Sequence, residues 1–177
     1  MLTVLLIPVP QVEITVGKLR NKYDRSSHLG IPSHITVLFP FMQSERIDNK
    51  VINQLKLVFG NIRSFEYKLS KVFNFPGVIY LQPNPRQSFI KLTKEVFKLF
   101  PKYPPYEGKF PKINPHLTLV DFSYTKKAVD NFDKIKYEIK KDMALKLPIK
   151  TTANCVWLME RRKTGQWHIH TKFKFSN

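Results

Sequence analysis

Apolar runs and helix-like spacings alternate through the first half of the chain. Residues 2–9 form an apolar run that predicts a buried strand. Apolar residues then recur at helical spacing over residues 12–23, and residues 34–39 form a strand rich in β-branched and aromatic side chains. A second helical stripe covers residues 47–58 and ends at Gly60. The first half is therefore predicted to run strand, helix, strand, helix.

The second half continues this alternation. Residues 65–75 and 78–81 have the pattern of two strands around a Pro-Gly turn, which predicts a hairpin. A helix is expected over residues 88–100. The segment 101–115 holds five of the thirteen prolines, so we expect an irregular loop there. The loop leads into a further predicted strand over residues 115–122.

The last third of the chain predicts one helix and two long strands. The strands are expected over residues 145–161 and 167–175, with a turn between them. The helix is predicted from apolar residues that share one face: Val129, Phe132, Ile135, Ile139 and Met143. This element order, without a regular parallel wind, predicts an α+β fold. We find no linker and no low-complexity segment, so residues 1–177 are expected to form a single domain.

A short motif occurs once in each half of the chain. Residues 32–38 read PSHITVL and residues 114–120 read NPHLTLV, so each copy holds histidine, an apolar residue, threonine and another apolar residue. In a strand, residues two apart point to the same face, so each histidine projects beside its own threonine. The residues concerned are His34 and Thr36 in the first copy and His116 and Thr118 in the second.

Paired in one cleft, these side chains have the chemistry for phosphate esters. If the two halves pack with approximate two-fold symmetry, the two imidazoles and the two hydroxyls converge. One neutral histidine can act as a base and one protonated histidine as an acid. The threonine hydroxyls can donate hydrogen bonds to phosphate oxygens. Each motif taken alone also fits a buried histidine that bonds a neighbouring hydroxyl.

The charge of the chain favours an anionic ligand. It has 30 basic and 13 acidic residues and a formal net charge of +17. Such a protein attracts polyanions, with RNA, DNA or an acidic membrane surface as candidates. Local basic clusters, such as Arg161, Arg162 and Lys163, also fit a solvated surface that keeps the protein soluble.

Targeting and redox signals are sparse. No apolar run approaches the ~20 residues that a membrane helix needs, so no membrane span is expected, and among the anionic candidates we expect RNA or a small nucleotide as the partner and not a membrane. The apolar start lacks a basic region and a cleavage site, and we interpret it as a strand of the mature protein. Cys155 is the one cysteine, which excludes an internal disulfide and favours a cytoplasmic location.

Two further groups of side chains are candidates for site residues. His168 and His170 share one strand face and invite a zinc site, but the nearest carboxylate in the sequence, Glu160, lies across the hairpin. We therefore expect a solvent-facing strand edge there. Tyr103 and Tyr106, in the proline-rich loop before the second motif, are the aromatic side chains we consider for stacking on a substrate base.

The paired motifs resemble those of the two-histidine (2H) phosphoesterase superfamily, which includes 2′-5′ RNA ligase-like proteins and cyclic nucleotide phosphodiesterases. The segments LFPF, GVIYLQP and WLMERRKTGQW are also similar to the bacterial ligase-like branch, so the resemblance covers essentially the whole chain. It implies a bilobal α+β fold, with two pseudo-symmetric antiparallel-sheet lobes, outer helices and a central groove.

The resemblance also implies a reaction. His34 and His116 would form the acid–base pair and Thr36 and Thr118 would bind the phosphate, without a metal or another cofactor. Some members of the family carry an arginine soon after the second motif, whereas Asp121 stands in that region here. A carboxylate beside an anion site is unfavourable, and strand alternation predicts that Asp121 points to the face opposite His116.

Two functions are compatible with these observations. The first is an enzyme that hydrolyses 2′,3′-cyclic phosphate or 2′-5′ phosphodiester bonds of RNA ends or small cyclic nucleotides. The second is a binding module of the same fold that holds RNA without turnover. The sequence leaves open the physiological substrate, hydrolysis against ligation, and which histidine is the acid. It also leaves the oligomeric state open, with a monomer as the default.

Overall fold

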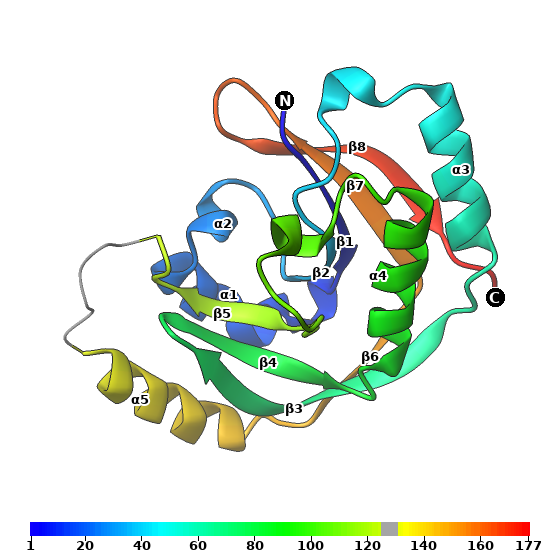
Figure 1. Ribbon diagram of the computed structural model, residues 1–177. Helices are drawn as coiled ribbons and strands as arrows, with labels where there is room; N and C mark the ends of the chain where they lie inside the picture. The colour runs from blue at the N-terminus through cyan, green and yellow to red at the C-terminus, as the bar shows by residue number, and fades with distance from the viewer. Residues whose placement is uncertain (125–130) are drawn as a thin grey trace.

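The computed structural model describes residues 1–124 and 131–177, and it contains two antiparallel sheets of four strands each (Figure 1). The strand orders are β2-β1-β7-β8 in the first sheet and β5-β4-β3-β6 in the second. The strands of the first sheet are β1 (Thr3–Pro8), β2 (His34–Leu38), β7 (Cys155–Arg161) and β8 (Trp167–Lys174). Those of the second sheet are β3 (Phe65–Phe75), β4 (Val78–Asn84), β5 (Leu117–Asp121) and β6 (Ile149–Ala153).

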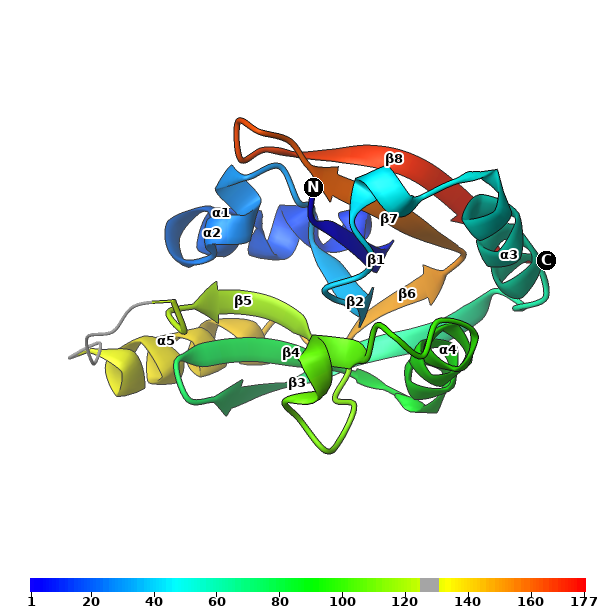
Figure 2. The ribbon, with the colours of Figure 1, turned by 45° about the horizontal axis from the view of Figure 1, so that its top comes forward.

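The helices lie around these sheets, which form two layers in Figure 2. Their bounds are α1 (Glu13–Tyr23), α2 (Arg25–His28), α3 (Asn49–Gly60), α4 (Gln87–Leu99) and α5 (Phe132–Ala144). Short 3₁₀ turns cover Pro10–Val12, Ser44–Arg46 and Pro105–Gly108. None of the helices in the described ranges combines the length and apolar character that a membrane span requires.

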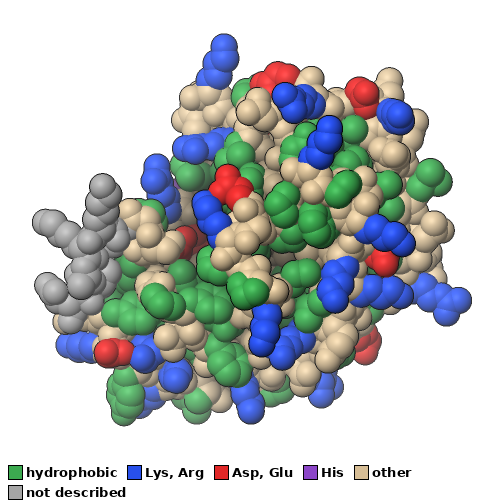
Figure 3. All heavy atoms as spheres, in the orientation of Figure 1, with side chains coloured by type: hydrophobic (Ala, Val, Ile, Leu, Met, Phe, Trp, Pro, Cys, Tyr) green, Lys and Arg blue, Asp and Glu red, His purple; other side chains and the backbone are tan. Residues whose placement is uncertain are grey.

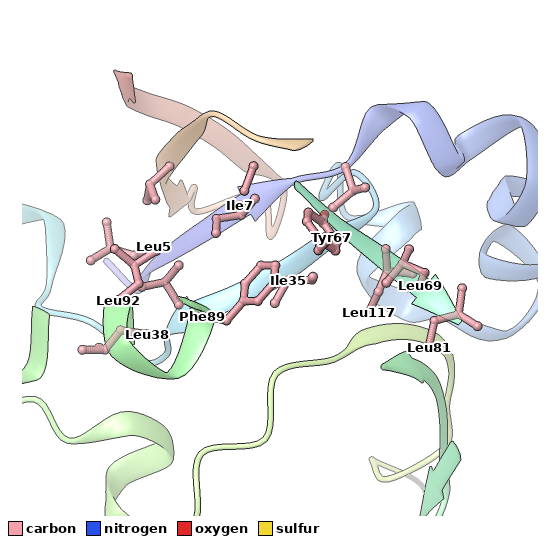
Figure 4. Close-up of a cluster of buried hydrophobic side chains, with 14 of the residues drawn as sticks. Leu5, Ile7, Ile35, Leu38, Tyr67, Leu69, Leu81, Phe89, Leu92 and Leu117 are labelled. Carbon is pink, nitrogen blue, oxygen red and sulfur yellow. The ribbon is translucent and has the colours of Figure 1, made fainter. Parts of the chain in front are cut away.

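One hydrophobic core joins the two sheets. Buried side chains from β1 and β2 meet buried side chains from β3, β4 and β5, and α4 adds further apolar groups (Figure 4). The labelled members are Leu5, Ile7, Ile35, Leu38, Tyr67, Leu69, Leu81, Phe89, Leu92 and Leu117. Because both lobes bury their apolar faces in this common core, the position of one sheet is tied to that of the other.

The helices cross between the lobes in a reciprocal way. Helix α1 follows β1 in the first sheet but packs against β5 of the second. Helix α4 follows β4 in the second sheet but packs against β2 of the first. Strands β2 and β5 are edge strands of their own sheets, and they contact each other. The predicted bilobal α+β fold is confirmed, and its pseudo-symmetry brings the two motif strands together.

The two motif strands share the same irregularity. Thr36 pairs with Leu6 and Leu38 with Leu5, so one extra residue is inserted into β2. In β5, Thr118 pairs with Tyr80 and Val120 with Ile79, which again leaves one extra residue. Both insertions are β-bulges, and each reverses the face to which the following side chains point.

One sequence expectation differs from this fold, and another lies partly outside the described residues. The predicted strand 145–161 is two strands, since the chain passes from the second sheet to the first at Asn154, between β6 and β7. Only Asn154 separates the two strands, and no proline or glycine marks the crossing, so the pattern alone does not reveal it. The predicted helix begins at Phe132 in the described part of the chain, and Val129 lies outside the described residues.

Candidate active site

A cavity of about 350 Å³ opens between the two motif strands. His34 and Thr36 reach it from β2, and Thr118 reaches it from β5. His116 precedes β5 directly, close enough for its positive charge to act on the pKa of His34. Three of the four motif side chains thus line one cavity, and the fourth, His116, lies beside it. Basic side chains are spread over the face seen in Figure 3 and do not gather in one patch.

The two imidazoles are held by the same type of hydrogen bond. Nδ1 of His34 lies 2.8 Å from the carbonyl oxygen of Pro32, and Nδ1 of His116 lies 2.7 Å from that of Asn114. A carbonyl only accepts hydrogen bonds, so Nδ1 carries the proton in both rings. Nε2 is then the nitrogen of each ring that is left for proton exchange with a substrate.

A buried arginine network supports the turn before His34. The Arg20 side chain, 1% exposed, forms ion pairs with Asp24 at 2.9 Å and with Glu13 at 3.1 Å. It also donates to the carbonyl of Ile31 at 3.1 Å and to the hydroxyl of Ser33 at 3.2 Å. These bonds fix residues 31–33, and with them the carbonyl that orients His34.

Aromatic rings and amides support His116 instead. Its ring lies 5.4 Å from that of Phe75, nearly perpendicular to it, and 5.3 Å from that of Tyr80, measured between centroids. The side chain of Asn114 donates to the Tyr80 hydroxyl at 3.2 Å and accepts from Gln82 at 3.3 Å. This lobe therefore orients its histidine through neutral groups and ring packing.

Burial shifts both histidines toward their neutral forms. It lowers the pKa of His34 from 6.5 to about 4. The positive charges of Arg20 and of His116 act in the same direction, whereas the hydrogen bond to Pro32 and the negative charge of Asp24 oppose the shift. Burial also lowers the pKa of His116, but the negative charge of Asp121 opposes that shift. The two equivalent imidazoles thus have different electrostatic surroundings.

The expectation for Asp121 was wrong. Asp121 lines the same cavity as Thr118, because the bulge at Leu119 reverses the strand alternation before it is reached. Its carboxylate accepts hydrogen bonds from the backbone and hydroxyl of Ser123, at 2.8 and 2.6 Å. In β2 the equivalent bulge turns Phe39 into the cavity as well, where strict alternation places it on the opposite face.

The two tyrosines of the proline-rich loop have different positions. Tyr106 forms a hydrogen bond with Thr36, and burial raises the pKa of its hydroxyl to about 12. Its backbone N–H donates to the Phe39 carbonyl at 2.6 Å. Tyr103 packs edge-on against Phe41, 5.6 Å between centroids, as part of the core. Tyr106 is therefore a neighbour of the site, whereas Tyr103 contributes to packing.

His168 and His170 lie on β8, the edge strand of the first sheet, and both are exposed. Glu160 pairs with His168 in register, but its carboxylate forms an ion pair with Arg162 at 2.9 Å. Across residues 1–124 and 131–177, no three histidine, cysteine or acidic side chains are grouped as metal ligands.

Several residues near the site were not singled out from the sequence. Phe75 belongs to a strand predicted correctly, but which strand faces the second histidine depends on the order of the sheet. Arg20 lies on the buried face of its helix. A basic residue at such a position is unusual, and its helical spacing in the sequence could have indicated it. Arg161, which the sequence marked only as part of a basic cluster, lines the cavity from the end of β7.

Two pseudo-symmetric sheets, each presenting a His-x-Thr strand to a shared groove, define the class of two-histidine phosphoesterase folds. Residues 8–165 match the sequence model of the 2′-5′ RNA ligase superfamily, and the chain belongs to this family. The resemblance seen in the motifs is thereby confirmed. The match covers most of both lobes, including the two motif strands.

Curated relatives and solved structures agree with this assignment. The chain is 23% identical to a candidate phosphoesterase of Bacillus cereus (strain G9842) over 176 residues, 97% of this chain and 95% of that protein. Escherichia coli LigT in complex with 3′-AMP has the same fold, with a TM-score of 0.61 at 14% identity over 99% of this chain and 98% of that one. A protein of Thermus thermophilus gives a TM-score of 0.57 at 18% identity, over 98% and 97% of the two chains.

Proposed function

We propose that the chain is a metal-independent phosphoesterase that hydrolyses 2′,3′-cyclic phosphates or 2′-5′ phosphodiester bonds of RNA ends or small nucleotides. The observation that carries this proposal is the meeting of two edge strands, which present His34, Thr36 and Thr118 to one cavity beside His116. Both lobes contribute to that site, so residues 1–177 would act as one unit.

The geometry supports an in-line hydrolysis with two proton transfers. A water oxygen attacks phosphorus while one imidazole Nε2 takes a proton from that water. The P–O bond to the leaving ribose oxygen breaks, and the second imidazole gives its proton to that oxygen. A cyclic phosphate and water thereby become a phosphate monoester and a free hydroxyl. The Thr36 and Thr118 hydroxyls would donate to the non-bridging oxygens as negative charge builds on them.

The surroundings of the two imidazoles favour one assignment of roles. His34, whose pKa is lowered to about 4, is neutral near pH 7 and suits the general base. Burial lowers the pKa of His116 as well, but the hydrogen bond to Asn114 and the carboxylate of Asp121 oppose that shift, so we assign the general acid to His116. Because the two imidazoles interact, the apparent pKa values of a rate profile belong to the pair.

Nucleotide ligands of structural relatives fit this substrate class. LigT of Escherichia coli, which shares the fold, has been crystallised with 3′-AMP, ATP and NADP⁺. A nucleotide 3′-monophosphate is one product expected from a 2′,3′-cyclic phosphate. The net charge of +17 would attract such anions to the protein.

The test is hydrolysis of adenosine 2′,3′-cyclic phosphate in the presence of EDTA. We expect turnover by the wild type and a loss of at least ~100-fold in His34→Ala and in His116→Ala, the range for one proton-transfer group. His168→Ala, on the exposed edge strand β8, is the matched control and should keep wild-type activity.

Three results would contradict parts of the proposal. No turnover by the wild type on the cyclic phosphate or on 2′-5′-linked RNA would remove the enzyme assignment. RNA binding without turnover would favour a binding module of the same fold. Activity that disappears with EDTA would refute the metal-independent mechanism.

A further inference from the structure

The cavity extends well beyond the two motifs. From Thr36 it continues over the open face of the first sheet to the start of β1 and the β7–β8 hairpin. Its volume of about 350 Å³ lies in the range that takes a small-molecule ligand. The scissile phosphate would occupy one end of this space, which leaves the larger part for the rest of the substrate.

An apolar floor forms the middle of the cavity. It belongs to a second hydrophobic cluster, separate from the core between the sheets. Phe39 and Trp167, whose ring centroids lie 6.3 Å apart, are the aromatic residues of this cluster that line the cavity, and Val4 and Ile31 are aliphatic ones. Such a surface suits the planar base and the sugar of a nucleotide.

Arg161 lies at the far end of this floor. It follows Trp157 and Met159 on one face of β7, and its register partner is Trp167. Its Nε donates to the Gly165 carbonyl at 3.2 Å, which orients the guanidinium and leaves its terminal nitrogens available. Gly165 has a φ of 91°, a conformation that L side chains rarely adopt, so the hairpin needs a glycine there.

The charges around Arg161 favour an anionic partner. Arg162, its neighbour in the sequence, forms an ion pair with Glu160, whereas Arg161 forms none with any described residue. Arg25 also lines the cavity and lies 5.8 Å from the ring centre of Tyr124.

Two acidic residues also line the cavity, and a carboxylate there repels an anionic ligand. Asp24 forms an ion pair with the buried Arg20 at 2.9 Å, so that guanidinium neutralises its negative charge. Asp121 lies on β5, at the end of the cavity that holds Thr118. In the described part of the chain, Arg25 and Arg161 are therefore the charged residues lining the cavity beside the first sheet whose charge no ion pair neutralises.

We infer that Arg161, assisted by Arg25, binds a second phosphate of the substrate, one nucleoside away from the phosphate at the histidines. The nucleoside between the two phosphates lies on the floor of Phe39 and Trp167. The preferred substrate is then a nucleotide with both a 2′,3′-cyclic phosphate and a 5′-phosphate, as at an RNA end. This inference rests on the proposed function and adds to it the feature that selects the substrate.

The test compares ligands with and without the 5′-phosphate. The kcat/KM values for adenosine 2′,3′-cyclic phosphate and its 5′-phosphorylated form are measured, together with the Kd values of 3′-AMP and adenosine 3′,5′-bisphosphate. We expect the wild type to prefer the 5′-phosphorylated member of each pair by ~10-fold or more, the usual value of a charge-assisted hydrogen bond. A dinucleotide ending in the cyclic phosphate separates a terminal phosphate from an internal phosphodiester.

The variants locate the preference. Arg161→Gln should reduce it to near one, and Arg25→Gln should reduce it less, because Arg25 is exposed. Lys163→Gln removes the same charge from the same hairpin and should leave the preference unchanged. Equal affinities of the wild type for the two nucleotides, or equal loss in Lys163→Gln and Arg161→Gln, would overturn the inference. The Kd values report on it even without turnover, so its failure is distinguishable from failure of the proposed function.

Discussion

The two motif strands carry the same residues in different surroundings. His34 and His116 each bond a backbone carbonyl through Nδ1, and each is followed by a threonine and a bulge. Behind His34 lies the buried guanidinium of Arg20, whereas Phe75 and Tyr80 pack against His116. The pseudo-symmetry thus provides two equivalent imidazoles, and the unlike surroundings give them different proton affinities.

The residue five positions after each histidine shows the same contrast. Both bulges turn this residue into the cavity, which places Phe39 in one lobe and Asp121 in the other. Phe39 adds apolar surface, and Asp121 adds a negative charge that favours a protonated His116. One structural device therefore contributes to binding in the first lobe and to proton affinity in the second.

The largest expected effect is on the histidines themselves. His34→Gln and His116→Gln should each lower kcat by ~10²- to 10⁴-fold, and the double variant should lose little more than either alone. Groups that act in one concerted step are not additive, so a double-mutant cycle of kcat measures their dependence. Strictly multiplicative losses would show that the two lobes act independently.

A large effect on stability is expected from the support behind His34. Arg20→Met leaves Asp24 and Glu13 without their cation, and breaking a buried ion pair costs about 3–5 kcal/mol of unfolding free energy. Asn114→Ala, behind His116, removes only neutral hydrogen bonds and should cost about 1 kcal/mol. Urea denaturation compares the two variants. Similar losses in both would mean that the arginine network contributes no more than the amide.

The pH dependence of stability should show that the folded chain disfavours protonation of His34. Its pKa is about 4 in the folded chain and 6.5 in its unperturbed form, so only the unfolded chain takes up this proton between those values. The contribution is complete above pH 6.5 and is lost as the pH falls toward 4, with a slope of at most ~1.4 kcal/mol per pH unit. In His34→Gln, the unfolding free energy measured by urea denaturation should change less with pH in this window. His168→Gln should keep the wild-type slope.

The smallest expected effect is on the rate profile and concerns Asp121. Asp121→Asn keeps an acceptor for Ser123 but removes the negative charge that raises the pKa of His116. The alkaline limb of kcat against pH should therefore move to lower pH, by less than about one unit for a single charge near a solvated groove. Asp142→Asn, at an exposed position of α5, removes an equal charge away from the groove and should leave the limb in place. A shift in the acid limb instead would reverse the assigned roles of the histidines.

Local pattern was sufficient for most elements of this fold. The hairpin of β3 and β4 and helix α4 lie close to their predicted ranges, because strand alternation and helical spacing are properties of neighbouring residues. The strand break at Asn154 was missed, since no proline or glycine separates the two strands although they belong to different sheets. Tyr103 and Tyr106 are alike in the sequence, and only their packing separates them.

The sequence by itself determined the two motifs, the side chains that share a strand face, and the net charge that favours an anionic ligand, because these depend on residue identity and short-range spacing. The tertiary structure decided the surroundings of the motifs. A bulge arises from pairing with a neighbouring strand, so the direction of Phe39 and Asp121 depends on β1 and β4. The placement of Arg20 behind one histidine and of Arg161 across the cavity likewise depends on packing between segments far apart in the chain.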